Sequence, residues 1–236
     1  RHTRWCVRSR GLGDVYKRQE VLGCTRCPLS EGRTQVVPGS GHPNAEILFV
    51  GEAPGYHEDK QGVPFVGQAG KLLDELLAGI GLTRADVFVA NVLKCRPPGN
   101  RDPRPEEIEA CESHLFRQIA IISPALVCTL GNFATKLLSG RPDGITRVHG
   151  HELPLTLGGR EVLLYPLFHP AAALYTPAMK DTLRADFARI PGLVNTLREG
   201  DPTPAPSASA QVATTDDPVT EAAMASEPGH DQLGLF

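Results

Sequence analysis

The stretch EILFVGEAPG, residues 46–55, is a short apolar run that ends in a turn rich in glycine and proline. Its apolar residues are continuous and do not alternate with polar ones, which is typical of a strand buried on both faces. The glycines of the turn allow the backbone to approach a ligand closely. The stretch therefore predicts a central strand with a candidate site at its carboxyl end.

Three more apolar runs follow this one, and helical patterns separate them. We predict strands over residues 46–50, 87–90, 125–130 and 162–168, and helices over 68–80, 105–122, 132–138 and 179–189. This alternation predicts an α/β protein: a three-layer α/β/α sandwich with a central four-stranded, mainly parallel sheet. Ligands of such sheets bind beyond the carboxyl ends of the strands, so chemistry is expected in 51–55, 91–96, 131–132 and 169–170.

The two ends of the chain differ from this middle part. Residues 1–19 are rich in Lys and Arg, show no sustained period and lack the apolar run of a signal peptide. We expect them to be non-native or disordered. Residues 199–236 contain no Lys or Arg and are rich in Pro, Ala, Ser and Thr, which predicts a disordered acidic tail. Residues 20–198 are then the globular domain, and no apolar run approaches the roughly 20 residues of a membrane span.

The cysteines suggest a metal centre. Cys24 and Cys27 form a C-x2-C pair, whereas Cys95 and Cys111 are widely spaced. Structural zinc commonly uses two closely spaced pairs, and four thiolates with one close pair suit an iron–sulfur cluster better. From spacing alone a cluster, a zinc site and a purely packing role all stay open. Cys128, inside an expected strand, is predicted to be a buried thiol.

The motifs at these positions, taken together, resemble the family 4 uracil-DNA glycosylases, the iron–sulfur-containing branch of that superfamily. The resemblance covers roughly residues 20–194 and rests on C-x2-C at 24–27, GEAPG at 51–55, GVPFVGQAGKLL at 62–73, NVLKCRPPGNRDPRPEE at 91–107, Cys111 and HPAA at 169–172. It implies a [4Fe-4S] cluster held by Cys24, Cys27, Cys95 and Cys111. A cluster in turn implies a reducing compartment, so a cytoplasmic location is expected.

The resemblance also implies an activity, the removal of uracil from single- and double-stranded DNA during base excision repair. The enzyme would flip the nucleotide out of the helix and hydrolyse its N-glycosidic bond. Phe65 would stack on the flipped base, and Asn91 would hydrogen-bond N3–H and O4 of uracil. His169 would donate to O2 as negative charge develops on the leaving base.

The first motif departs from the best-known branch of the superfamily at two positions. Ala53 stands where that branch has the Asp that directs the attacking water, so Glu52 or backbone must do this, and we predict Glu52. Ala53 itself is predicted to line the substrate pocket. Gly55 stands where that branch has the tyrosine that excludes thymine, and Glu58 is the predicted substitute.

Two segments, Lys94–Pro105 and Pro170–Pro177, are expected to face the DNA. Arg96, Arg101 and Arg104 lie among the prolines of the first segment, which suggests a stiff loop that contacts phosphates. The net charge of −3 gives no sign of bulk affinity for nucleic acid, so the arginines would have to be concentrated at this surface.

The last five residues, QLGLF at 232–236, resemble the pentapeptide by which bacterial proteins bind the sliding clamp. Leu233, Leu235 and Phe236 would fill an apolar cleft and Gln232 would make the polar contact, with the tail as tether. The protein itself is expected to be a monomer. Two alternatives stay open: a non-catalytic DNA-binding module, and a replication adaptor with a structural metal site.

Overall fold

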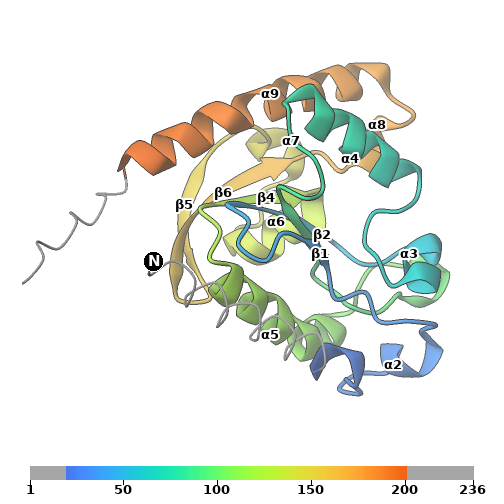
Figure 1. Ribbon diagram of the computed structural model, residues 1–236. Helices are drawn as coiled ribbons and strands as arrows, with labels where there is room; N and C mark the ends of the chain where they lie inside the picture. Colours follow the sequence, from blue (N-terminus) through green and yellow to red (C-terminus); the bar gives the residue numbers. More distant parts are fainter. Residues whose placement is uncertain (1–19, 201–236) are drawn as a thin grey trace, which may run out of the picture. The chain divides into compact units, whose positions relative to one another are not determined.

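The computed structural model describes residues 20–200, which form three layers around one sheet (Figure 1). The expected segment 1–19 and the tail from residue 201, with its pentapeptide at 232–236, lie outside the described residues. Within these bounds six strands pair in the order β1-β3-β2-β4-β6-β5. They are β1 (Ser40–Gly41), β2 (Ile47–Gly51), β3 (Phe88–Asn91), β4 (Leu126–Leu130), β5 (Leu153–Leu157) and β6 (Arg160–Leu167).

The four predicted strands are confirmed as β2, β3, β4 and β6, which pair in parallel at the centre of the sheet. The predicted number of strands is wrong, because β1 and β5 add an antiparallel strand at each edge. β1 has only two residues, too few for a pattern. β5 joins β6 through Gly158 and Gly159, which both have positive φ, as tight hairpin turns require. That glycine pair was a usable hairpin signal in the sequence.

Helices cover both faces of the sheet (Figure 1). α4 (Gln68–Gly79) and α9 (Pro177–Gly200) lie on one face, and α5 (Pro105–Ile122) and α6 (Asn132–Ser139) on the other. Successive side chains of β2 lie on opposite faces of the sheet. Phe49 packs with α4 and α9, and Val50 packs with α5 and α6. This two-sided burial explains why the strand is apolar throughout. The other elements of the described residues are short: α2 (Leu29–Gly32), α3 (Tyr56–Gln61), a 3-10 turn η1 (Pro98–Asn100), α7 (Ile145–Val148) and α8 (Pro170–Ala173).

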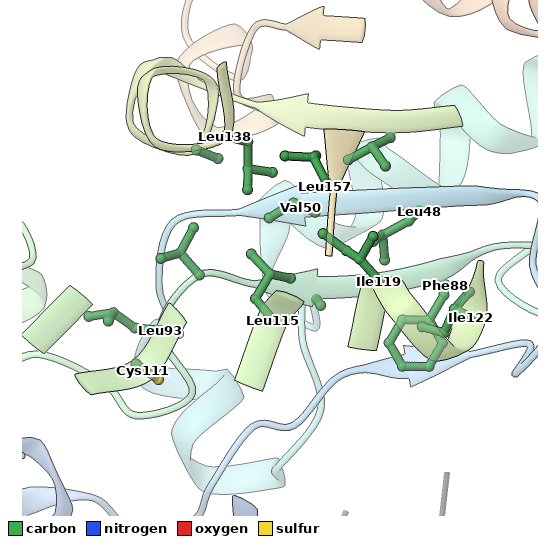
Figure 2. Close-up of a cluster of buried hydrophobic side chains, with 14 of the residues drawn as sticks. Leu48, Val50, Phe88, Leu93, Cys111, Leu115, Ile119, Ile122, Leu138 and Leu157 are labelled. Carbon is green, nitrogen blue, oxygen red and sulfur yellow. The ribbon is translucent and has the colours of Figure 1, made fainter. Parts of the chain in front are cut away.

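Helix α5 follows its predicted apolar stripe. Figure 2 shows Leu115 and Ile119 packed beneath Leu48 and Val50 of β2, with Cys111 at the end of the same cluster. Glu107 in the first turn accepts a hydrogen bond from the backbone N–H of Arg104 at 2.9 Å, which satisfies a free donor of the helix N-terminus.

Helix α9 is longer than the sequence predicted. It continues through Pro191, although a proline inside a helix removes a backbone hydrogen bond. Ile190 and Val194, on either side of the proline, are both buried in the core, so packing maintains the helix there. No helix of the described range is long and apolar enough to span a membrane.

Candidate active site

The ends of strands β2 and β3 lie side by side at the carboxyl edge of the sheet. Gly51 and Asn91 are partners in the parallel register. The pairing continues past the strands, because the N–H groups of Val92 and Leu93 donate to the carbonyls of Gly51 at 2.9 Å and Glu52 at 3.0 Å. The GEAPG turn is thereby fixed against the segment that follows β3.

Gly51 is the point where two predicted substrate-binding side chains meet. A Cβ atom at this position would lie 2.7 Å from Cζ of Phe65 and closer still to the amide oxygen of Asn91. Any side chain here would therefore displace one of the two. The absence of a side chain at Gly51 allows the phenyl ring and the amide to approach the same backbone turn.

The backbone of Phe65 has a positive φ of 54°, which is strained for a residue with a side chain. Two neighbours hold it in place. Arg84 donates to the Phe65 carbonyl at 2.8 Å, and α4 packs so closely that a Cβ at Gly70 would overlap that carbonyl. The aromatic ring is thus presented by a conformation that the surrounding structure maintains.

His169 follows β6 and begins α8. Its Nδ1 accepts the backbone N–H of Ala171 at 3.1 Å, so the proton of the neutral ring resides on Nε2. The imidazole stacks on Phe65, with ring centroids 5.6 Å apart and an interplanar angle of 29°. Burial lowers the pKa of His169 to about 4. At neutral pH the group is an uncharged hydrogen-bond donor.

Asn91 is 2% exposed. Its backbone carbonyl accepts a hydrogen bond from Lys94, but its side-chain amide makes none to any residue between 20 and 200. A nearly buried amide without a protein partner is costly unless a ligand or water completes it. The group is therefore available to pair with a ligand.

The remaining predicted site residues surround this centre. Glu52 is half-buried, and burial, followed by the negative charge of Asp102, raises the pKa of its carboxyl above the usual value. Ala53 packs at the margin of the core. A Cβ at Gly55 would lie 2.7 Å from Oε2 of Glu58, so that carboxylate lies over the turn.

The four predicted cysteine ligands line one small cavity between α2, the segment after β3 and α5. All four are free thiols. Within residues 20–200 no three His, Cys, Asp or Glu side chains lie close enough together to hold a single metal ion. A [4Fe-4S] cluster is larger and takes one thiolate per iron, so its ligands stand further apart.

Two N–H groups and one histidine ring nitrogen face the sulfur atoms of this cavity. Arg33 donates to Sγ of Cys95 at 3.3 Å, the backbone N–H of Lys94 lies 3.3 Å from Sγ of Cys111, and Nε2 of His114 lies 3.4 Å from Sγ of Cys24. Burial raises the pKa of Cys111 to about 11, so a thiolate there requires a positive partner. Donors aimed at sulfur and buried thiols both fit a cationic cluster core.

Comparison with known proteins identifies the family. A family model described as the uracil DNA glycosylase superfamily matches residues 38–189. The chain belongs to this superfamily, in its type-4 branch. It is 48% identical over 178 residues to a type-4 uracil-DNA glycosylase of Sulfurisphaera tokodaii, covering 73% of this chain and 81% of the relative. A type-4 enzyme of Archaeoglobus fulgidus is 47% identical (76% and 91% covered), and one of Thermotoga maritima 48% (68% and 86%).

The three arginines predicted to contact phosphates differ in their surroundings within this glycosylase-family fold. Arg101 is bound through both nitrogens to the buried carboxylate of Glu107, at 2.5 and 2.9 Å. Arg96 lies over the ring of Tyr56, 5.2 Å from its centroid. Arg104 is exposed. A role in DNA binding stays a prediction for all three, and Arg101 already has a structural partner.

Sequence reasoning missed several residues around the site of this family member. It expected the DNA-facing segment to begin at Lys94, but that side chain is buried. The only available signal was a lysine inside the apolar run NVLKC. Arg33, Arg84 and His114 gave no signal, because each acts on a residue distant in sequence.

Proposed function

We propose that this protein removes uracil from single- and double-stranded DNA by hydrolysing its N-glycosidic bond, with the residues of the candidate site in the roles that follow. The observation that carries the proposal is the meeting of three groups at the carboxyl edge of the sheet. These are the free amide of Asn91, the ring of Phe65 and a neutral His169 with its proton on Nε2. Family membership supports the same activity.

Recognition of the base falls to Asn91 and Phe65. The flipped uracil stacks on the phenyl ring, and the amide pairs with N3–H and O4. Cytosine presents the reverse pattern of donor and acceptor, so its entry leaves buried polar groups unpaired, at about 1–3 kcal/mol each. Glu58, beside the turn, limits the space at C5 of the base and so disfavours the methyl group of thymine.

Bond cleavage needs stabilisation of the departing uracil anion. Nε2–H of His169 donates to O2 of the base as the charge develops, which lowers the barrier because the donor is already oriented. Glu52 is half-buried at the same turn and positions the attacking water, and Ala53 lines the pocket. The ionised form of Glu52 is the one that accepts a hydrogen bond from water.

Cys24, Cys27, Cys95 and Cys111 would hold a [4Fe-4S] cluster. When bound, such a cluster serves as a structural tie between the N-terminal segment, the loop after β3 and α5. Thiolates of this kind persist in a reducing compartment, in accord with the cytoplasmic location expected for a monomeric DNA repair enzyme.

The direct test is uracil release. Purified protein is expected to form abasic sites in oligonucleotides that contain uracil, and not in matched ones with cytosine or thymine. Asn91→Ala is expected to lower kcat/KM about 100-fold, because two buried hydrogen bonds to the base are lost. Release is measured by alkaline cleavage of labelled strands. A clean preparation without activity would contradict the enzymatic function and favour a non-catalytic DNA-binding module.

The DNA surface next to the site carries two exposed apolar side chains. Leu174 and Tyr175 directly follow α8, and Tyr175 is 89% exposed. Apolar side chains beside a base-flipping site can enter the stack that the base leaves. They lie in the predicted DNA-facing segment 170–177, and Arg96 and Arg104 lie in the other one.

The C-terminal pentapeptide 232–236, outside the described residues, supports a second partner, the bacterial sliding clamp. Deletion of 232–236 is expected to abolish clamp binding and to leave uracil release from short oligonucleotides unchanged, because the tail acts only as a tether. Binding is measured with purified clamp by surface plasmon resonance. Replacement of Leu233 and Leu235 by alanine is the matched control for chain length. Equal affinity of full-length and shortened protein would remove the clamp from the proposal.

A further inference from the structure

Lys94 is a lysine in the protein core, only 1% exposed. Its Nζ donates to the backbone carbonyl of Asn91 at 2.7 Å and to Oε1 of Gln118 at 2.7 Å. Burial of an amine is expensive unless acceptors are held ready for it. We therefore expect the ammonium group of Lys94 to have a role that an apolar side chain such as leucine or methionine could not fill.

The two acceptors belong to different parts of the molecule. Asn91 ends strand β3 at the candidate active site, whereas Gln118 lies on α5. Gln118 is itself fixed, because its Nε2 donates to the carbonyl of Pro38 at 2.6 Å. A chain of three hydrogen bonds thus connects the peptide of Asn91 to α5 and to the segment before β1.

Lys94 also adjoins the cysteine cavity, through its backbone. Its N–H faces Sγ of Cys111, and Cys95 is the next residue. The backbone and the side chain of Lys94 thus contact two different sites. The backbone N–H contacts the cysteine cavity, and the side chain contacts Asn91, whose free amide is the proposed recognition group for uracil.

We propose that Lys94 is a positioning residue: its side chain fixes the Asn91 peptide on α5 and so sets the direction of the recognition amide. This inference rests on the proposed function. Asn91 is the last residue of its strand, and its amide has no partner among the described residues to orient it. The peptide that follows Asn91 is held at its N–H by the Gly51 carbonyl and at its carbonyl by Lys94, so Lys94 supplies one of two restraints on how Asn91 meets the base.

A replacement at Lys94 separates this role from support of the cysteine site. Lys94→Met keeps an unbranched side chain that ends one atom short of Nζ and keeps the backbone N–H toward Cys111, but it removes both side-chain hydrogen bonds. We expect kcat/KM for uracil DNA to fall about 30-fold and inhibition by free uracil to weaken by a similar factor. Absorbance per protein at about 400 nm, typical of an iron–sulfur cluster, is expected to stay unchanged.

The decisive measurement is a double-mutant cycle with Asn91→Ala. If Lys94 acts through Asn91, adding Lys94→Met to Asn91→Ala lowers kcat/KM less than about threefold further. A full 30-fold loss in both backgrounds, or unchanged inhibition by free uracil in the single variant, would overturn the inference. Lys94→Leu, a smaller apolar side chain that also removes both hydrogen bonds, gives the same reading should Lys94→Met fail to fold.

Lys136→Met is the matched control, since Lys136 is an exposed lysine on α6. It is expected to behave as wild type in every assay. Assaying the wild-type protein beside the variants distinguishes failure of the proposed function from failure of the role proposed for Lys94. If wild type releases no uracil, the proposed function fails. If wild type is active and the cycle is additive, only the role of Lys94 fails.

Discussion

Replacing His169 by alanine is expected to lower the single-turnover rate of uracil release about 100- to 1000-fold, with little change in KM. In the proposed mechanism the hydrogen bond from Nε2 would strengthen only as charge develops on the base, so its loss would affect the transition state more than the bound substrate. The orientation is already set, because Nδ1 accepts the N–H of Ala171. Rates are measured with excess enzyme on a labelled oligonucleotide.

His151, exposed on the loop after α7, supplies the control for this variant. His151→Ala is expected to keep the wild-type rate. A rate for His169→Ala within about fivefold of wild type would exclude a direct role in stabilising the leaving base. Loss of rate together with a large fall in Tm would instead point to a structural role for the histidine at the start of α8.

The pH dependence follows from the direction of the pKa shifts. The pKa of His169 is lowered to about 4 by burial, so the neutral donor persists from neutral pH down to about 5. No step in rate is expected near pH 6.5, where a free histidine titrates. Between about pH 6.5 and 4, His169 is protonated in the unfolded chain but still neutral in the folded protein. The free energy of unfolding therefore decreases as pH falls through this range. We expect the fall in rate at acid pH to follow protonation of Glu52 instead. Because the pKa of its carboxyl is raised, Glu52 loses its charge at a higher pH than an ordinary glutamate.

Replacement of Cys111 by serine is expected to remove the absorbance at about 400 nm and to lower Tm by about 10 °C or more. Cys111 lies on α5 and faces a cavity that α2 and the segment after β3 complete. If the proposed cluster is bound, loss of one ligand would release it and remove a tie between residues 20–36 and α5, beside the contacts Arg117–Glu20 and Arg26–Ser113. Iron content and thermal unfolding measured on the same anaerobic preparation test both parts.

Cys128→Ala is the matched control, because Cys128 is a fully buried thiol on β4, away from the cysteine cavity. It is expected to retain iron and colour. Equal iron content in Cys111→Ser and wild type would contradict the assignment of Cys111 as a ligand. Zinc in place of iron in the wild-type protein would favour the zinc alternative that the spacing left open.

The sequence alone was sufficient for the centre of this fold. Four continuous apolar runs became β2, β3, β4 and β6, because a strand buried on both faces must be apolar along its whole length. Gly51, Asn91 and His169 come at or just after strand ends, so the parallel order of the sheet brings them to one edge. These features are local in sequence and depend only on burial and strand direction.

The tertiary structure decided what depends on contacts between distant residues. Phe65 meets His169 across more than a hundred residues, and its strained backbone is held by Arg84 and by α4. The partner of Arg101 proved to be Glu107 on α5, in place of an open surface. Lys94, a charged residue in a loop motif, is buried because two acceptors are arranged around it. Sequence pattern records whether a side chain is polar, but only packing determines which atoms lie within 3 Å of it.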